Sequence, residues 1–501
     1  MTDKIGIVDL FSGPGGLGEG FAAAGRELGD VVRIALSVEN DLHAFETMRL
    51  RAFLRGHGED FPTGYHKALN DGKPLPDWST MHLRRWKRAC SETMRATLGG
   101  EGTFERIAPL LDGERSRRHG LTVLIGGPPC QAYSLVGRAR NRGNVGYVPE
   151  DDGRHFLYRE YVGILERLRP AAFVMENVKG MLSSKVGADG IFSRVLDDLE
   201  GTGDGYRLLA LTTAARDRPR PLPKDFVVRA EEHGIPQARH RVFIIGFRND
   251  IRIPEDRVLL TTGSGGSRSV LSVIEDLPRL RSGLSRDDSH EAWRREVLAM
   301  AELVTGSEDV PEEVADATEL LLENGLGHHR DRTAVVRAGN DWPSADDDLA
   351  QWMHDPDLIL VLHHETRGHI PGDVGRYLYA ATFGLCFDRS PKLAEFPATL
   401  QPAHRNRRTG VFADRFRVQI GDRPSSTVTS HISKDGHYYI HPDPMQARSL
   451  TVREAARLQT FPDNYLFCGP RTEQYRQVGN AVPPFLAKQI GAAVLSVLMG
   501  S

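Results

Sequence analysis

The stretch that decides the fold is Ile5-Gly6-Ile7-Val8-Asp9-Leu10-Phe11-Ser12-Gly13-Pro14-Gly15-Gly16-Leu17-Gly18. It begins as a short aliphatic run without polar alternation, which is typical of a strand covered on both faces. Glycines follow, which let the backbone turn sharply and approach a ligand closely, and then helical sequence begins. This order of strand, glycine-rich turn and helix predicts the first unit of an α/β fold, with a ligand site at the turn.

Four further aliphatic runs, each followed by polar residues, occupy positions 34–38, 121–125, 172–175 and 242–245. Because helical stretches separate most of them, the pattern predicts an α/β protein with a doubly wound, mostly parallel sheet. Ligands of such sheets bind beyond the carboxyl ends of the strands, so the polar residues after each run are the candidates for function.

The chain has 501 residues, about three times the length of a typical domain of ~150 residues. We expect a catalytic domain over 1–249 with an insertion at 57–120, a loop-rich domain over 250–447, and a segment 448–501 that completes the catalytic domain. The insertion carries a basic cluster at 84–88 around one tryptophan, for which a solvated helix face is favoured over a nucleic-acid contact.

Composition excludes several classes of protein. Hydrophobic residues make up 40% and charged residues 26%, as in ordinary soluble proteins. No run approaches the ~20 apolar residues of a membrane span, and the N-terminus lacks the features of a signal peptide. Four scattered cysteines do not make a disulfide framework. We therefore expect a cytoplasmic enzyme without a membrane anchor. His363, His364, His369 and Cys386 fit no standard metal spacing, so no metal is expected.

Several residues after the runs are chemically suggestive. Glu39 stands where an acid can bind ribose hydroxyls, although a surface carboxylate at a helix start is an equally good explanation. Cys130 follows two prolines at a strand end. A lone cysteine is more often a small buried hydrophobe, but this position, followed by an arginine-rich loop at 137–146, favours a nucleophile. Arg239 and Arg241 alternate, so they share one face of a strand.

Six motifs occur in order along the chain: DLFSGPGG (9–16), GGPPCQAYS (126–134), ENVKG (176–180), GIPQARHR (234–241), LTVREAARLQTFPD (450–463) and QVGNAVPP (477–484). Together they resemble the C5-cytosine DNA methyltransferases, which carry these motifs in this order around a long variable region. The resemblance covers the catalytic half and the C-terminal segment. The central region is not identified by these motifs.

The resemblance implies a catalytic set. Cys130 would attack C6 of a flipped-out cytosine, Glu176 would contact N3 and the exocyclic amine, and Arg241 would hold the target base. Gln237 and Arg239 match neighbouring motif positions and join the catalytic candidates with lower-ranked roles.

The resemblance also implies S-adenosyl-methionine as the cofactor. Phe11 would lie against its adenine and Glu39 would bind its ribose. The methionine part would be lined by Gly13, Pro14, Gly15 and Asn480. An acid that contacts the adenine amine is also implied, but the 57–120 insertion obscures it and we assign none.

The implied substrate is double-stranded DNA, read at a specific sequence by the 250–447 domain. We expect the modification enzyme of a restriction–modification system: a cytoplasmic monomer, at the nucleoid when acting, whose cognate restriction endonuclease acts separately. An RNA cytosine-5 methyltransferase of the same fold is the alternative, and the large central region argues against it. A non-catalytic DNA-binding protein is disfavoured because Cys130, Glu176 and Arg241 are all present. The target sequence cannot be predicted from the chain.

The net charge of −3 conceals two unlike regions. Residues 302–323 contain eight acids and no Lys or Arg, so the rest of the chain carries +5. Residues 401–448 carry eight Lys and Arg against four acids. We therefore expect the acidic run to face away from DNA, and the arginines of 137–146 and 401–448 to face the phosphates.

Overall fold

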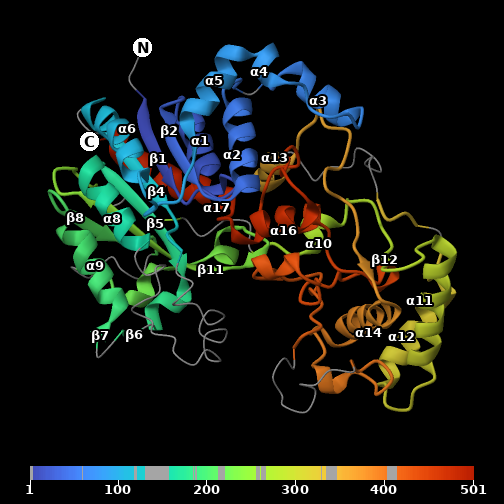
Figure 1. Cartoon of the computed structure of the whole chain (residues 1–501). Helices are drawn as coiled ribbons and strands as arrows, with labels where there is room; N and C mark the ends of the chain where they lie inside the picture. Colours follow the sequence, from blue (N-terminus) through green and yellow to red (C-terminus); the bar gives the residue numbers. More distant parts are fainter. Residues whose placement is uncertain are drawn as a thin grey trace.

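The computed structural model describes residues 4–58, 60–117, 121–129, 157–183, 185–186, 189–212, 220–254, 260, 267–328, 330–333, 347–402 and 414–500. Two lobes lie side by side, one built on a large sheet and one mainly helical, with the C-terminal helices at their junction (Figure 1). Cys130 and the arginine-rich loop 137–146 lie outside the described residues.

The larger lobe is built on an eight-stranded sheet with the order β3-β2-β1-β4-β5-β11-β8, in which β9 also pairs with β11. Pairing is parallel from β3 to β5, whereas β11 is antiparallel to its neighbours. All five strands expected from the sequence are present, and the α/β fold class is confirmed. The strands are β1 (Ile5–Leu10), β2 (Val32–Glu39), β3 (Thr93–Arg95), β4 (Thr122–Gly126), β5 (Ala172–Val178), β8 (Tyr206–Leu209), β9 (Val227–Arg229) and β11 (His240–Arg248).

Helices cover both faces of this sheet because the strands are apolar on both sides. On β1, Ile5 and Ile7 face one core, with α1 (Gly16–Glu27) and α17 (Pro484–Met499), while Val8 and Leu10 face the other. The second core is closed by α6 (Thr103–Ser116), α8 (Leu157–Leu168) and α9 (Ile191–Gly201). The chain thus forms a three-layer α/β lobe.

The segment 57–120 has two parts. Three helices protrude at the top of Figure 1 beyond α2 (Leu42–Arg55): α3 (Thr63–Asn70), α4 (Trp78–Met81) and α5 (Leu83–Glu92). The arginines of α5 are exposed, while Trp86 packs edge-on against Phe53. From Thr93 onward the chain returns to the sheet, because β3 pairs with β2 and α6 packs against α8.

The second lobe has a helical core that the sequence analysis did not predict. Its long helices are α11 (His290–Thr305), α12 (Glu312–Glu323) and α14 (Pro371–Phe387). The strand pair β12 (Gly283–Leu284) and β13 (Gly368–His369) also lies in this lobe. By contrast, α10 (Leu271–Ile274) and α13 (Asp348–Met353) pack into the core that contains α1 and α17. The acidic run lies on α11 and α12 at the outer edge of this lobe, with α14 between them and the sheet (Figure 1).

The C-terminal segment joins the two lobes through α15 (Val452–Leu458) and α16 (Arg471–Asn480). The span Arg471–Met499 is long and apolar enough to cross a membrane by length and composition. However, residues 481–483 separate α16 from α17, and 61% of its most apolar window is buried. Since α17 packs along α1, this span is explained as core helices of the larger lobe.

Gly20 allows the close packing of α1 on α17. A Cβ there would lie 2.4 Å from the Cβ of Ala487 and 2.6 Å from the backbone of the same residue. We predict that Gly20→Ala destabilises the protein by about 1–3 kcal/mol, because overpacking outweighs the gain in helix propensity. Urea unfolding measures this.

The matched control is Gly113→Ala in α6, where nothing lies within 4 Å of the added Cβ. It should be neutral or stabilise by roughly 0.5–1 kcal/mol. Equal effects of the two substitutions would contradict the packing argument.

Candidate active site at the carboxyl edge of the sheet

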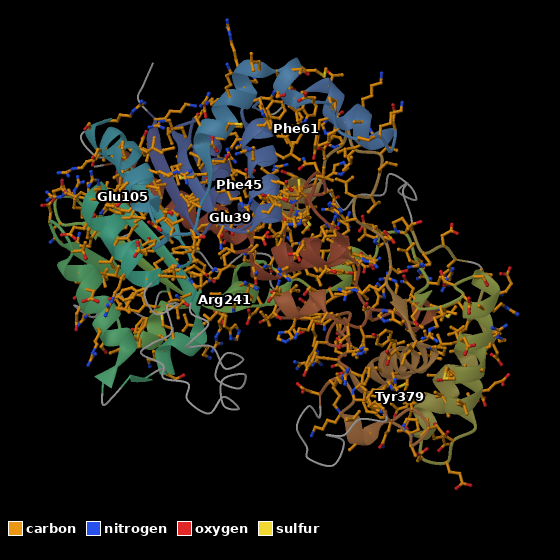
Figure 2. The ribbon with its side chains drawn as sticks, in the orientation of Figure 1. Glu39, Phe45, Phe61, Glu105, Arg241 and Tyr379 are labelled. Atoms are coloured by element: carbon orange, nitrogen blue, oxygen red, sulfur yellow. The ribbon has the colours of Figure 1, made fainter. Side chains whose placement is uncertain are left out.

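A pocket of about 400 Å³ runs along the carboxyl edge of the sheet. Residues that follow β3, β2, β1, β4 and β5, in their order in the sheet, all line it. With about 4.8 Å between neighbouring strands, such a strip is roughly 19 Å long. The predicted residues that line it are Phe11, Gly13, Pro14, Glu39, Glu176 and Asn480. Figure 2 shows Glu39 and Arg241 in the sheet lobe, with Tyr379 in the other lobe.

The glycine-rich turn after β1 is held by the end of β2. Glu39 accepts hydrogen bonds from the backbone N–H of Gly13 at 2.7 Å, of Asn40 at 2.8 Å and of Asp41 at 2.7 Å. Burial raises the pKa of Glu39, and these backbone donors oppose that rise. The carboxylate therefore fixes the turn, and it also lines the pocket.

Phe11 and Gly15 have backbone conformations that shape the turn. Phe11 has a φ of 55°, a left-handed conformation that is uncommon for an aromatic residue, and it lines the pocket. Gly15, with a φ of 102°, is the N-cap of α1 and is not among the lining residues. The neighbouring Pro14 carbonyl accepts a hydrogen bond from Tyr465 Oη at 2.6 Å, which ties the turn to the C-terminal segment.

At the other end of the pocket, the lining residue Glu176 forms an ion pair with Arg241, which is not itself among the lining residues. Arg241 Nε lies 3.2 Å from Glu176 Oε1, and both side chains are mostly buried. Burial lowers the pKa of Arg241, an effect that Glu176 opposes. β11 pairs with β5 so that Arg241 lies opposite Val178, two residues beyond Glu176. The antiparallel strand thus brings a guanidinium to the end of a parallel one.

The loop after β4 approaches this ion pair closely. A Cβ on Gly127 would lie 2.9 Å from Glu176 Oε2, so a larger residue there would require the Glu176 carboxylate to move. Asn177 Nδ2 donates to the carbonyl of Pro128 at 3.2 Å, which fixes the loop to β5. Pro129 lines the pocket, and Cys130 is the next residue in the sequence.

Gln237 and Arg239 lie outside the pocket. Both are buried and not among the pocket-lining residues. Gln237 Oε1 accepts from Val428 N at 2.9 Å, and its amide donates to the Leu458 carbonyl at 3.1 Å. Arg239 Nη1 donates to the Val428 carbonyl at 2.8 Å. Burial and the charge of Arg241 lower the pKa of Arg239 to about 9. These contacts give both residues a role in holding the segment around Val428 beside β10 (Gln237–Ala238).

Sequence reasoning missed two parts of the pocket wall. Ala96, Thr97 and Leu98, directly after β3, form one of them. Three-residue β3 has no aliphatic run to mark it, so only its pairing with β2 reveals it. Glu473 and Arg476 of α16 form the other, and helical spacing from Asn480 could have found them.

The sequence matches the family described as C-5 cytosine-specific DNA methylase over residues 114–496. The chain belongs to this family. It is similar to the type II methyltransferase M.Bpa9945I of Bacillus paralicheniformis, with 32% identity and 99% of each chain covered. It is also similar to M.AgeI of Thalassovita gelatinovora, with 29% identity over 97% of this chain and 98% of that protein.

The fold agrees with this membership. A solved structure described as a putative DNA modification methyltransferase from an E. coli prophage superposes with a TM-score of 0.52 at 19% identity. It covers 99% of this chain and 100% of its own. The protein is therefore a DNA cytosine-5 methyltransferase with the α/β fold that the motifs predicted.

The buried ion pair of this methyltransferase can be tested in the free protein. Glu176→Gln leaves Arg241 buried without its counter-charge, so we predict a destabilisation of about 1–3 kcal/mol in urea unfolding. Glu473→Gln is the control, because its partner Arg476 is about half exposed. It should change stability by less than about 0.5 kcal/mol. If Glu176→Gln and Glu473→Gln both changed the stability by less than about 0.5 kcal/mol, the result would contradict a role of Glu176 in stabilising the buried charge of Arg241.

Proposed function

We propose that this enzyme transfers a methyl group from S-adenosyl-methionine to C5 of a cytosine extruded from a specific duplex sequence. One observation carries the proposal. A single pocket joins Glu39 at the end of β2, the glycine-rich turn after β1, the loop leading to Cys130, and Glu176 near the end of β5. A cofactor and a base placed in one strip can therefore meet near the β1–β4 boundary, where the strand order reverses.

The described residues fit this cofactor. Glu39 offers a carboxylate for a ribose diol, and Phe11 offers an aromatic ring beside it. Gly13 has a φ of 56° and nothing within 4 Å of a would-be Cβ, so the turn leaves open space for a ligand. Asn480 adds an amide from α16 for the polar methionine end. Phe11, Gly13, Pro14, Glu39 and Asn480 would hold the cofactor, with Gly15 shaping the turn. When bound, the cofactor supplies an electrophilic methyl group.

The catalytic proposal begins at Cys130. C5 of cytosine is a weak nucleophile, and addition of the Cys130 thiolate to C6 makes C5 electron-rich. The electron pair pushed into the ring is drawn towards N3, to which Glu176 donates a hydrogen bond when its carboxyl group is protonated. Arg241 keeps Glu176 oriented and faces the same base. After C5 has taken up the methyl group, a base removes the C5 proton, the C5–C6 double bond re-forms and Cys130 leaves.

In this proposal the second lobe binds the DNA, and residues 250–447 form the recognition domain. Base extrusion costs a few kcal/mol, so the duplex must be held close to the pocket. The segment around Val428 is bonded to Gln237 and Arg239, and Thr427 Oγ1 donates to the carbonyl of Ala238 at 2.6 Å. These hydrogen bonds attach the segment around Val428 to residues 237–239, which directly precede the strand that carries Arg241. Gln237 and Arg239 act as positioning residues.

We infer a role as the modification enzyme of a restriction–modification system, because the relatives that match along their full length are type II methyltransferases. The substrate is then double-stranded DNA, the enzyme acts as a cytoplasmic monomer, and a cognate endonuclease acts separately. RNA is not favoured as the substrate, since the matching family is described as a DNA methylase.

Trapping tests the nucleophile. With S-adenosyl-methionine present, a duplex with 5-fluorocytosine at the mapped target should form a stable adduct with the wild-type protein, because after methyl transfer the C5 fluorine cannot leave as the proton does. Cys130→Ala should form none and should lose methyl transfer, while its melting temperature stays unchanged. Mass spectrometry of the digested adduct locates the bond. Turnover retained in Cys130→Ala would contradict the covalent mechanism.

Calorimetry tests the cofactor site. Glu39→Ala should weaken binding of S-adenosyl-homocysteine by about tenfold or more, because a hydrogen bond from a ribose hydroxyl to a charged acceptor is lost. Glu46→Ala, an exposed acid on α2, is the control and should bind normally. Unchanged affinity in Glu39→Ala would refute the ribose assignment.

A further inference from the structure

The wall of the pocket beyond Glu39 is formed by Ala96, Thr97 and Leu98. They directly follow β3, and Ala96 N donates to the carbonyl of Glu39 at 3.0 Å, which continues the β3–β2 pairing. Leu98 is buried and Thr97 is the polar side chain of this wall. Thr97 Oγ1 donates to Asn40 Oδ1 at 2.9 Å, so the hydroxyl is held at the end of β2 with its lone pairs free to accept.

The order of groups along the pocket indicates which part of the cofactor lies against residues 96–98, and this placement rests on the proposed function. The reacting methyl must lie next to the base, and the base is bound after β4 and β5. Glu39 after β2 binds the ribose, so the purine extends further along the same edge, to the end of β3. The strand order β3-β2-β1-β4-β5 leaves no other direction within the described sheet.

We propose that the Thr97 hydroxyl binds the 6-amino group of the cofactor's purine, and that no carboxylate does so. As a consequence, the protein should bind a cofactor analogue without the amino group only slightly more weakly than one that carries it. A neutral hydroxyl accepting one hydrogen bond contributes less than a charged acceptor in the same place.

The nearby acids make other contacts or lie at another strand end. Glu39 accepts three backbone N–H groups, and Asp41, which lines the pocket beyond the end of β2, uses one carboxylate oxygen to cap α2 by accepting from Ala44 N at 2.9 Å. Residues 93–100 contain no Asp or Glu. Glu160 of α8 lies beside Gly99, since a Cβ on Gly99 would lie 3.3 Å from its Cγ, but it is not among the pocket-lining residues. Thr97 is therefore the acceptor best placed for the amine.

The test compares two ligands by calorimetry: S-adenosyl-homocysteine and its 6-deamino analogue, in which hydrogen replaces the amino group and N1 is unchanged. For the wild-type protein the deamino analogue should bind at most about tenfold more weakly. In Thr97→Asp that ratio should rise to about a hundredfold, because a charged acceptor now selects for the amine. In the isosteric Thr97→Val the ratio should fall towards one, and Thr97→Ser should keep the wild-type ratio.

Other outcomes overturn the inference in distinct ways. A wild-type ratio of a hundredfold or more, or an unchanged ratio in Thr97→Val, contradicts the role of Thr97. A ratio that collapses in Glu160→Gln assigns the amine to a carboxylate instead. Circular dichroism confirms that each variant is folded, and Thr97→Val decides the matter if Thr97→Asp is unstable. Failure of the wild-type protein to bind S-adenosyl-homocysteine at all would refute the proposed function itself.

Discussion

The carboxyl ends of five parallel strands meet at one edge of the sheet, and every group of the site depends on that constraint. Parallel pairing from β3 to β5 places Thr97, Glu39, Phe11, Gly127 and Glu176 in a row, although 165 positions separate Phe11 from Glu176 along the chain. These residues line an elongated pocket, and the distance between neighbouring strands determines the distance between their side chains. A cofactor and a base can then be held in sequence without any large loop to join them.

A second constraint is a set of buried arginines that holds the two lobes in place. Arg453 donates to the carbonyls of Leu362, Pro462 and Tyr465, and Arg457 bonds to Asp463 and Asp276. The bonds to Leu362 and Asp276 join α15 to the 250–447 region, and the others fix the chain that follows α15.

Arg448 belongs to the same set and forms a two-pronged ion pair with Glu454. Burial works against the charged form of that acid, but Arg448 holds the pKa of Glu454 well below its usual value. Paired, buried charges of this kind fix geometry strongly, because removal of one partner leaves the other uncompensated. The family motif LTVREAARLQTFPD is thus explained as a structural joint more than as a source of reacting groups.

Much of the larger lobe was predictable because its signals are local. Aliphatic runs gave β1, β2, β4, β5 and β11, and the residues after them gave Glu39 and Glu176. Sequence patterns did not predict elements that depend on contacts between distant parts of the chain. β3 is three residues long and carries no aliphatic run, so the wall at Thr97 was hidden within an apparent insertion.

The second lobe shows the same limit. The sequence predicts a loop-rich domain over 250–447, but α11, α12 and α14 form a helical core there. Gln237 and Arg239 joined the catalytic candidates through their motif, whereas their buried hydrogen bonds to the segment around Val428 could be seen only in three dimensions.

The measurement that tests the central claim most directly is a crystal structure of the protein after reaction with S-adenosyl-methionine and a duplex carrying 5-fluorocytosine at the target, so that S-adenosyl-homocysteine and the trapped base are both present. The account predicts one continuous row: the purine between Phe11 and residues 96–98, the ribose on Glu39, and the cytosine bonded to Cys130 with Glu176 at N3. A purine bound at the β4–β5 end, or a target base outside this pocket, would contradict it.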